Sequence, residues 1–279
     1  MKVTSAIFAI AMVVLGCAKS SVEIVESTKT IKVDKIPLDQ LCITVIYDNT
    51  AYFEELKPDW GFACVIDGPE EKILFDTGAK GDLFGINLDK LACHPREISK
   101  TVISHKHFDH VGGLTTFLKS NSDVKVFLLE SFPKRIKESV EKAGAALVTV
   151  STPMAISTGV YSTGSMGKTP KEQSLVITTD KGAIVITGCA HPGIVEIVRK
   201  AKKMTGQEIL FVMGGFHLMG QSRDEIQAII DEFHQMGVRS VGPCHCTGNK
   251  QIEQFREDYG HRCLDIGVGR EITGIDFMQ

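Results

Sequence analysis

The 279-residue chain lacks several features that would point to common classes of function. It has no run of basic residues, and 31 Lys and Arg against 34 Asp and Glu leave a net charge of −3, so we expect no nucleic-acid partner. Its apolar run at residues 7–15 is too short to span a bilayer as a stable helix. No internal repeat and no obvious domain break divides the chain. What is present is the composition of a soluble globular protein, with 43% hydrophobic residues, enough to bury a large core.

The chain has 8 cysteines, but their spacing does not indicate a disulfide framework. If Cys17 is modified, an odd number remains, and these cannot all pair within one chain. Several of them stand in strand-like apolar runs, where a free thiol behaves as a small hydrophobic group. Cys244 and Cys246 flank His245, which is more typical of the wall of a metal site. We therefore predict no disulfide. The remaining cysteines are Cys42, Cys64, Cys93, Cys189, Cys244, Cys246 and Cys263.

The first seventeen residues have the pattern of a processing signal. A positive start at Met1-Lys2 precedes the apolar run, which ends in Gly16-Cys17. This resembles a bacterial lipoprotein signal, with cleavage before Cys17 and lipid on its sulfur. The alternatives are an ordinary secretory signal or an anchor that is retained. We expect a signal at 1–17, a polar tether at 18–40 and one domain at 41–279, in a protein that is lipid-anchored in the bacterial cell envelope and faces the periplasm.

The globular part begins with strands and continues with strands that alternate with helices. Strands are predicted at 42–47, 60–66 and 72–75, and the alternating pattern follows. The same order returns after residue 175. This succession predicts an α/β fold, an αββα sandwich in which two mixed β-sheets lie face to face with helices on the outside.

The most informative stretch is His-Lys-His-Phe-Asp-His at 105–110, directly after a short apolar, β-branched run. Alternate side chains of an extended chain share one face, so His105, His107 and Asp109 can converge on one point. The chain then turns, and His110 can face a second point nearby. Neutral imidazole and carboxylate bind zinc and other divalent ions. A polar surface loop with chance histidines is the alternative for this stretch alone.

Three more histidines follow predicted strands in turns rich in Gly or Pro. They are His191, His217 and His245. Taken singly, each could be an ordinary loop histidine. Together with 105–110, they predict one site at one edge of the sandwich. The histidines without such a setting are His94, His234 and His261.

With these motifs, the chain resembles the metallo-β-lactamase superfamily over about residues 41–275. The resemblance is carried by His-x-His-x-Asp-His at 105–110, by Phe-Asp-Thr-Gly at 75–78 and by the later single histidines. Finer motifs are similar to the branch of 7,8-dihydropterin-6-methyl-4-(β-D-ribofuranosyl)-aminobenzene-5′-phosphate synthase. These motifs lie at 48–49, 172–175, 188–193, 214–218 and 245–248.

The resemblance implies two divalent ions, zinc or alternatively magnesium, manganese or iron. The first ion would be held by His105, His107 and His191. The second would be held by Asp109, His110 and His245. Asp76 would lie behind these ligands and orient one of them or a neighbouring loop.

One departure from the superfamily pattern concerns the carboxylate that bridges the two metals. Most dinuclear members have an Asp after the strand that is predicted here at 209–213, whereas this chain has Gly-Gly-Phe-His at 214–217. His217 would then bind a metal, or act on the substrate as an acid or hydrogen-bond donor. Asp109 would orient a metal-bound hydroxide as a second catalytic residue. Asn49 is a candidate substrate contact, with a purely structural role in the turn as the alternative.

The function that these residues predict is a metallohydrolase that acts on a small ester, lactone, amide or phosphoester. One alternative is the synthase-like activity on a phosphorylated pterin precursor, as in the similar branch. Another is a non-catalytic metal-binding lipoprotein, and an iron-dependent oxygenase is a minor variant. Apart from the small-molecule substrate, the predicted partner is the membrane, through the lipid on Cys17. The oligomeric state is left open.

Overall fold

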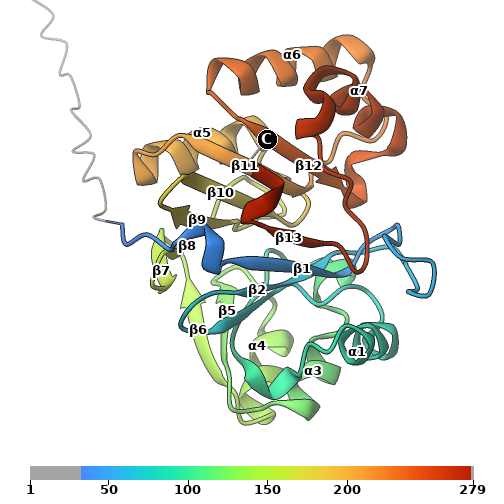
Figure 1. The fold of residues 1–279 in the computed structure, drawn as a ribbon. Coiled ribbons are helices and arrows are strands. Elements are labelled where there is room, and N and C mark those ends of the chain that lie inside the picture. The colour runs from blue at the N-terminus through green and yellow to red at the C-terminus, as the bar shows by residue number, and fades with distance from the viewer. Residues whose placement is uncertain (1–32, 278–279) are drawn as a thin grey trace, which may run out of the picture.

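A computed structural model describes residues 33–277 of the chain (Figure 1). Two mixed β-sheets pack face to face, and helices cover their outer sides. The predicted αββα sandwich is therefore confirmed. The predicted signal at 1–17, its Cys17 and the tether up to residue 32 lie outside the described residues. Within residues 33–277, no helix has the length and apolar character needed to cross a membrane.

The first sheet has seven strands and carries the N-terminal half of the domain. Its strands are β1 (Cys42–Tyr47), β2 (Ala63–Asp67), β3 (Lys72–Phe75), β4 (Ile98–Val102), β5 (Lys125–Leu129), β6 (Ala146–Val150) and β13 (Glu271–Thr273). They lie in the order β13-β1-β2-β3-β4-β5-β6. Pairing is antiparallel from β13 to β3 and parallel from β3 to β6. The helices of this half are α1 (Gly81–Lys90), α2 (Phe108–Val111), α3 (Leu114–Ser120) and α4 (Lys134–Lys142).

The second sheet has six strands and carries the C-terminal half. Its strands are β7 (Met154–Ser157), β8 (Val160–Ser162), β9 (Leu175–Thr179), β10 (Gly182–Thr187), β11 (Ile209–Gly215) and β12 (Ser240–Cys244). They lie in the order β12-β11-β10-β9-β8-β7, and β10, β11 and β12 are parallel. The outer helices are α5 (Ile194–Thr205), α6 (Arg223–Gln235) and α7 (Asn249–Tyr259).

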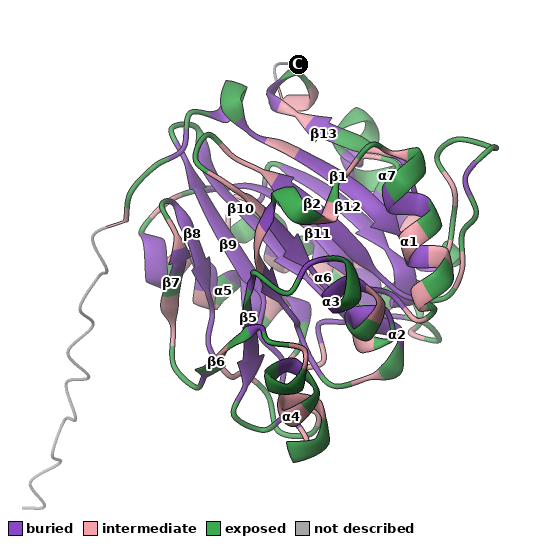
Figure 2. Cartoon of the chain, turned by 90° about the horizontal axis from the view of Figure 1, so that it is seen from below, coloured by how far each residue is buried: buried purple, intermediate pink, exposed green. Residues whose placement is uncertain are grey.

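The central strands are buried on both faces, as Figure 2 shows for β10 and β11. In β10, Ile184 and Ile186 belong to the core between the two sheets, whereas Val185 belongs to the core beneath α5, α6 and α7. Successive side chains of a strand point to opposite faces, so a strand between two apolar layers needs apolar residues throughout. This is why the sequence of β10 reads as an unbroken apolar run.

The topology brings the carboxyl ends of five strands to one edge of the sandwich. β3 and β4 run parallel in the first sheet, and β10, β11 and β12 run parallel in the second. A loop that carries polar residues leaves each of these strands at its carboxyl end. Side chains that are far apart in sequence therefore meet at this edge.

The predicted boundary between tether and domain at residue 41 is wrong. Ile36 and Leu38 are buried, with 3% and 7% of their surface exposed. The Ile36 backbone N–H donates to the carbonyl oxygen of Thr178 at 2.9 Å, and the Leu38 N–H donates to Asp180 Oδ1 at 3.0 Å. These apolar side chains and their backbone bonds attach the segment to the second sheet, so the domain includes at least residues 36–40.

Candidate metal centre

Three imidazoles form the first of two donor clusters at this edge. His105 and His107 come from the loop after β4, and His191 comes from the loop after β10. His107 Nδ1 lies 3.1 Å from His105 Nε2 and 3.2 Å from His191 Nε2. Two nitrogens on a tetrahedral zinc ion, with bonds of about 2.0–2.1 Å, are separated by about 3.3 Å. The spacing of the ring nitrogens therefore fits a divalent cation between them.

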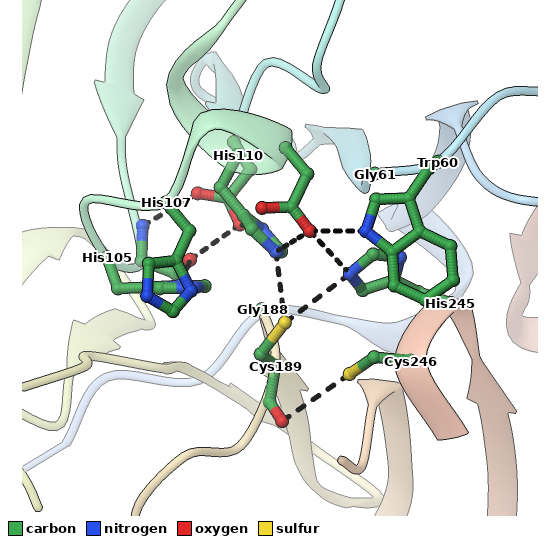
Figure 3. Close-up of polar contacts among 12 residues, drawn as sticks. Trp60, Gly61, His105, His107, His110, Gly188, Cys189, His245 and Cys246 are labelled. Carbon is green, nitrogen blue, oxygen red and sulfur yellow. Dashed lines mark hydrogen bonds and ion pairs between the residues drawn. The ribbon is translucent and has the colours of Figure 1, made fainter. Parts of the chain in front are cut away.

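The second cluster lies beside the first and contains four donors (Figure 3). Asp109 and His110 come from α2, and Asp109 Oδ2 lies 3.7 Å from His110 Nε2 and 3.4 Å from His245 Nε2. The fourth donor is Cys189, which is not among the ligands predicted from the sequence. The rings of His105 and His110 are 4.2 Å apart, so the two clusters are adjacent.

The protonation of the imidazoles also suits metal binding. Burial, together with the neighbouring His110 and His191, holds the pKa of His105 far below its ordinary value. Burial and the nearby His217 lower the pKa of His191 to about 4. Both imidazoles are therefore neutral at pH 7, which is the form that coordinates a metal.

Asp76 at the end of β3 orients one ligand of each cluster. Its Oδ2 lies 2.7 Å from His110 Nδ1 and accepts a hydrogen bond of 2.7 Å from Ser104 Oγ. Ser104 Oγ is in turn 2.9 Å from His105 Nδ1. With Nδ1 engaged in both imidazoles, each Nε2 points toward the donor clusters. Such hydrogen bonds fix the ring orientation and the tautomer of metal ligands.

The Asn49 side chain connects the end of β1 to His245. Its Oδ1 accepts a hydrogen bond of 3.0 Å from the Gly61 N–H and lies 3.0 Å from His245 Nδ1, while its Nδ2 donates to the His245 carbonyl oxygen at 2.9 Å. The amide is thus engaged with the protein on both sides. Asn49 therefore positions His245. It also lines the cavity beside the second cluster, and its role as a substrate contact stays a prediction.

Glu172, the first residue of the motif at 172–175, holds the loop after β10. Its Oε1 accepts hydrogen bonds from the N–H groups of Gly188, Cys189 and Ala190 at 2.9–3.1 Å. Its Oε2 accepts from the His191 N–H at 2.8 Å. Burial raises the pKa of Glu172, and these N–H groups oppose that rise. The loop therefore wraps around one carboxyl group and directs Cys189 and His191 to the two donor clusters.

Trp60, the single tryptophan of the chain, contacts the second cluster. Its Nε1 donates to Asp109 Oδ2 at 2.8 Å, and its ring lies 5.0 Å from the ring of His245. With 40% of its surface exposed, Trp60 also faces solvent. Its position within a predicted strand concealed this role, since the strand starts only at Ala63.

His217 lies at the rim of the first cluster. Its ring is 4.5 Å from the ring of His191, and its donor atom groups with those of Cys189 and Cys246 within 4.8 Å. A hydrogen bond with Cys246 raises the pKa of His217. His217 is exposed, whereas the six predicted ligands are more deeply placed, with His105 and His110 fully buried.

Backbone strain is concentrated at the site. Among the described residues, five that are not glycine have positive φ, and four of them belong to the site. These four are Asp76 (58°), Ala190 (57°), His217 (55°) and His245 (49°). Each follows the end of a strand, where the chain turns sharply. Such conformations cost about 1–3 kcal/mol each and persist where the surroundings hold them in place.

A cavity of about 670 Å³ opens beside the second cluster. It is bordered by Trp60 and His245 on the side of the metal centre, and by Met219 and Lys250 farther out. No carboxylate lines it, and Lys250 makes no ion pair within the described residues. The lining is therefore mostly polar, with the apolar surface of Trp60 and Met219 and one positive charge on Lys250.

Comparison with known proteins agrees with this geometry. A sequence model of the metallo-beta-lactamase superfamily matches residues 58–147. An uncharacterised protein of Methanocaldococcus jannaschii is 30% identical over 262 residues, which cover 81% of this chain and 100% of that protein. These findings and the fold define a protein with the metallo-β-lactamase fold. The chain belongs to the metallo-β-lactamase superfamily.

Two further relatives have more descriptive names. The 7,8-dihydropterin-6-methyl-4-(beta-D-ribofuranosyl)-aminobenzene-5′-phosphate synthase of M. jannaschii is 28% identical, with 82% of this chain and 94% of that protein covered. A crystal structure of a metal-dependent hydrolase of the beta-lactamase superfamily is similar with a TM-score of 0.70 and 27% identity, covering 83% of this chain and 98% of that one. The metallo-beta-lactamase fold protein YhfI from Bacillus subtilis has a TM-score of 0.62 at 11% identity, covering 84% and 99%, which shows the shared fold.

Proposed function

We propose that the protein is a metal-dependent hydrolase of a small ester, lactone, amide or phosphoester. The observation that carries the proposal is the cluster of His105, His107 and His191, which offers three donors and so leaves one coordination place for water. A bound divalent ion, zinc above all, would lower the pKa of this water toward ~7 and stabilise a developing oxyanion. A non-catalytic metal site would be expected to have both clusters closed by protein donors.

Asp109 is suited to orient the attacking water. Burial alone would raise the pKa of its carboxyl group, but the hydrogen bond with His245 and the charge of His110 hold it below its ordinary range. Asp109 is therefore a carboxylate at pH 7, and Trp60 fixes its Oδ2. A carboxylate in this position accepts a hydrogen bond from water next to the metals.

His217 is suited to assist the leaving group. It lies at the rim beside His191, and Cys246 raises its pKa, which favours the protonated form. A protonated imidazole can donate to a leaving-group oxygen or nitrogen. The cavity bordered by Trp60, Met219 and Lys250 would receive the rest of the substrate.

A second candidate is a synthase activity like that named for the M. jannaschii relative. The similarity extends over 94% of that protein. In the cavity, Lys250 and the absence of a lining carboxylate suit a phosphorylated substrate. The two candidates differ in the reaction rather than in the metal centre.

We also propose that the protein is a lipoprotein of the bacterial cell envelope that faces the periplasm. The support is the sequence pattern that ends in Gly16-Cys17. Metabolic labelling with a radioactive fatty acid should mark the wild-type protein and not the Cys17→Ala variant. Equal labelling of both would exclude lipid on this cysteine.

The hydrolase is tested by metal analysis and turnover on the same sample. The purified chain should contain about two metal ions and hydrolyse at least one of a panel of chromogenic phosphodiester, lactone, ester and amide substrates. His107→Ala should abolish this activity, whereas His94→Ala, outside the site, should retain it. Metal-loaded protein without any turnover on the panel would favour the synthase, which is then assayed on a phosphorylated pterin precursor.

A further inference from the structure

We propose that Cys189 is a ligand of the second metal position and takes over the linking role of the missing bridging carboxylate. The second position would then have four protein donors, and the open coordination place would belong to the first position alone. The inference rests on the metal centre of the proposed function and goes beyond it, because it assigns a thiolate ligand and distinguishes the two positions.

The distances between donor atoms support a four-coordinate position. Cys189 Sγ lies 3.1 Å from His110 Nε2 and 3.4 Å from His245 Nε2. For tetrahedral zinc, with bonds of about 2.3 Å to sulfur and 2.0–2.1 Å to nitrogen, the expected separation of sulfur and nitrogen is about 3.6 Å. The fourth donor atom is a carboxylate oxygen of Asp109. The four atoms lie within 4.8 Å of one another, and all four residues are buried. One oxygen, two nitrogens and one sulfur thus surround one point.

The end of β11, where a bridging carboxylate was expected, has no room for one. A Cβ atom on Gly215 would lie 2.7 Å from Cys246 Sγ and 3.0 Å from His245 Cδ2. A Cβ atom on Gly214 would lie 2.0 Å from the carbonyl oxygen of Thr187. Side chains therefore cannot enter the metal centre from these two positions, and the absent Asp is not replaced from the same strand.

The loop after β10 supplies the replacement instead. Cys189 and His191 are two residues apart in a turn that is held by Glu172, so one loop gives a ligand to each position. Gly188 permits this approach, because a Cβ atom there would lie 2.2 Å from Ser104 Oγ and 3.0 Å from Asp76 Oδ2. The loop thus links the two positions through its backbone, whereas a bridging carboxylate would link them through a single side chain.

Cys246 is the competing candidate for a thiolate ligand. Its Sγ lies 3.7 Å from the carbonyl oxygen of Cys189, and its donor atom groups with those of Cys189 and His217 but not with those of Asp109, His110 and His245. We therefore assign the ligand role to Cys189 and not to Cys246. A thiolate ligand favours zinc or iron over magnesium and manganese at this position.

Cobalt substitution of the full-length protein tests the assignment, because a thiolate bound to Co²⁺ gives a charge-transfer band in the near ultraviolet. We expect this band in the wild type and in Cys246→Ser, and its loss in Cys189→Ser. Bound cobalt should fall from about two ions to about one per chain in Cys189→Ser. A band that persists in Cys189→Ser, or that is lost only in Cys246→Ser, would overturn the proposal.

Two controls separate a failed ligand assignment from other failures. If Cys189→Ser does not fold, the wild type is loaded with cadmium and measured by cadmium NMR. The signal of a thiolate-bound ion lies far downfield of the signal of an ion with only nitrogen and oxygen ligands. The absence of a downfield signal would refute the assignment. Hydrolysis is measured on the same cobalt samples. A thiolate band without hydrolysis supports the thiolate ligand and refutes the hydrolase. Hydrolysis without the band supports the hydrolase and refutes the thiolate ligand.

Discussion

The Asp76 carboxylate and the His110 imidazole are both fully buried, and Asp76 Oδ2 lies 2.7 Å from His110 Nδ1. The pair joins the end of β3 to α2 in the His-x-His-x-Asp-His stretch. Because Asp76 also accepts hydrogen bonds from Ser104, which contacts His105, one carboxylate orients an imidazole of each donor cluster. The orientation of the ligands thus depends on a side chain that is itself outside both clusters.

Asp76→Asn should weaken metal binding without removing a ligand. In place of Oδ2 the amide nitrogen cannot accept from Ser104 Oγ or His110 Nδ1, and in place of Oδ1 it cannot accept from the Ser104 N–H, so either orientation weakens the network that orients the imidazoles. We expect metal affinity to fall by about 10–100-fold, measured by competition with a chromogenic chelator. Asp89→Asn, on the exposed end of α1, is the matched control. Unchanged affinity in Asp76→Asn would show that the imidazoles hold their orientation without this carboxylate.

Glu172→Gln should disturb both metal positions at once. The amide NH₂ group would face at least one of the backbone N–H groups that now donate to the carboxylate, so a buried donor would lose its acceptor. We expect a loss of about 1–3 kcal/mol in the free energy of unfolding, from denaturant titration. Metal content should fall at both positions, because this loop carries Cys189 and His191. The surface variant Glu208→Gln should show neither effect, and loss at a single position would contradict the role of the loop.

Trp60→Phe should lower turnover more than metal content. Phenylalanine keeps an aromatic surface beside His245 but removes the N–H that donates to Asp109 Oδ2. One hydrogen bond to a charged group is worth about 1.5–3 kcal/mol, so we expect kcat/KM to fall by at least about tenfold. Tyr52→Phe removes a polar group from an exposed aromatic residue away from the clusters and serves as the control. Equal losses in both variants would argue against a specific role of the indole N–H.

The contribution of Glu71 to the stability of the fold is expected to depend on pH. Burial acts to raise the pKa of this carboxyl group, but hydrogen bonds from Lys100, Ser157 and Ser99 outweigh it and lower the pKa below the ordinary value. The contacts join the turn between β2 and β3 to β4 and to β7 in the other sheet. A lowered pKa in the folded state means that the stabilisation is present above the unfolded pKa of about 4.3 and is lost as pH falls through the folded value.

Glu71→Gln should therefore destabilise the protein at pH 7 by about 1–3 kcal/mol and much less in acid below the folded pKa. Thermal unfolding of wild type and variant across this range measures the difference. Glu70→Gln, at the neighbouring exposed position, should leave the pH profile unchanged. A difference between wild type and Glu71→Gln that is constant with pH would exclude the charge as its cause.

The sequence predicts the layers of the fold because strand composition and the order of elements are local properties. It also indicates which histidines gather, since His105, His107 and His110 share one loop and His191 and His245 follow parallel strands. The structure adds Cys189, Trp60 and Glu172, whose roles depend on contacts across the chain. Cys189 looked like an apolar filler, and Glu172 acts only through the backbone of a loop that folds around it.

Two other differences between the predicted and the observed structure also arise from contacts between distant parts of the chain. Asn49 appeared to be a free polar residue in a turn, and only the packing of His245 against it shows that its amide is engaged. Ile36 and Leu38 lacked the periodicity of a strand, yet both are buried in the main hydrophobic core. In both cases, the partner lies more than a hundred residues away, beyond the range of any local pattern.

The loop that Glu172 holds has a consequence for metal uptake. Its Cys189 and His191 would serve different positions, and four backbone N–H groups that donate to Glu172 fix the loop independently of any ion. The proposed ligands would then be preorganised, so neither ion would have to order the loop when it binds.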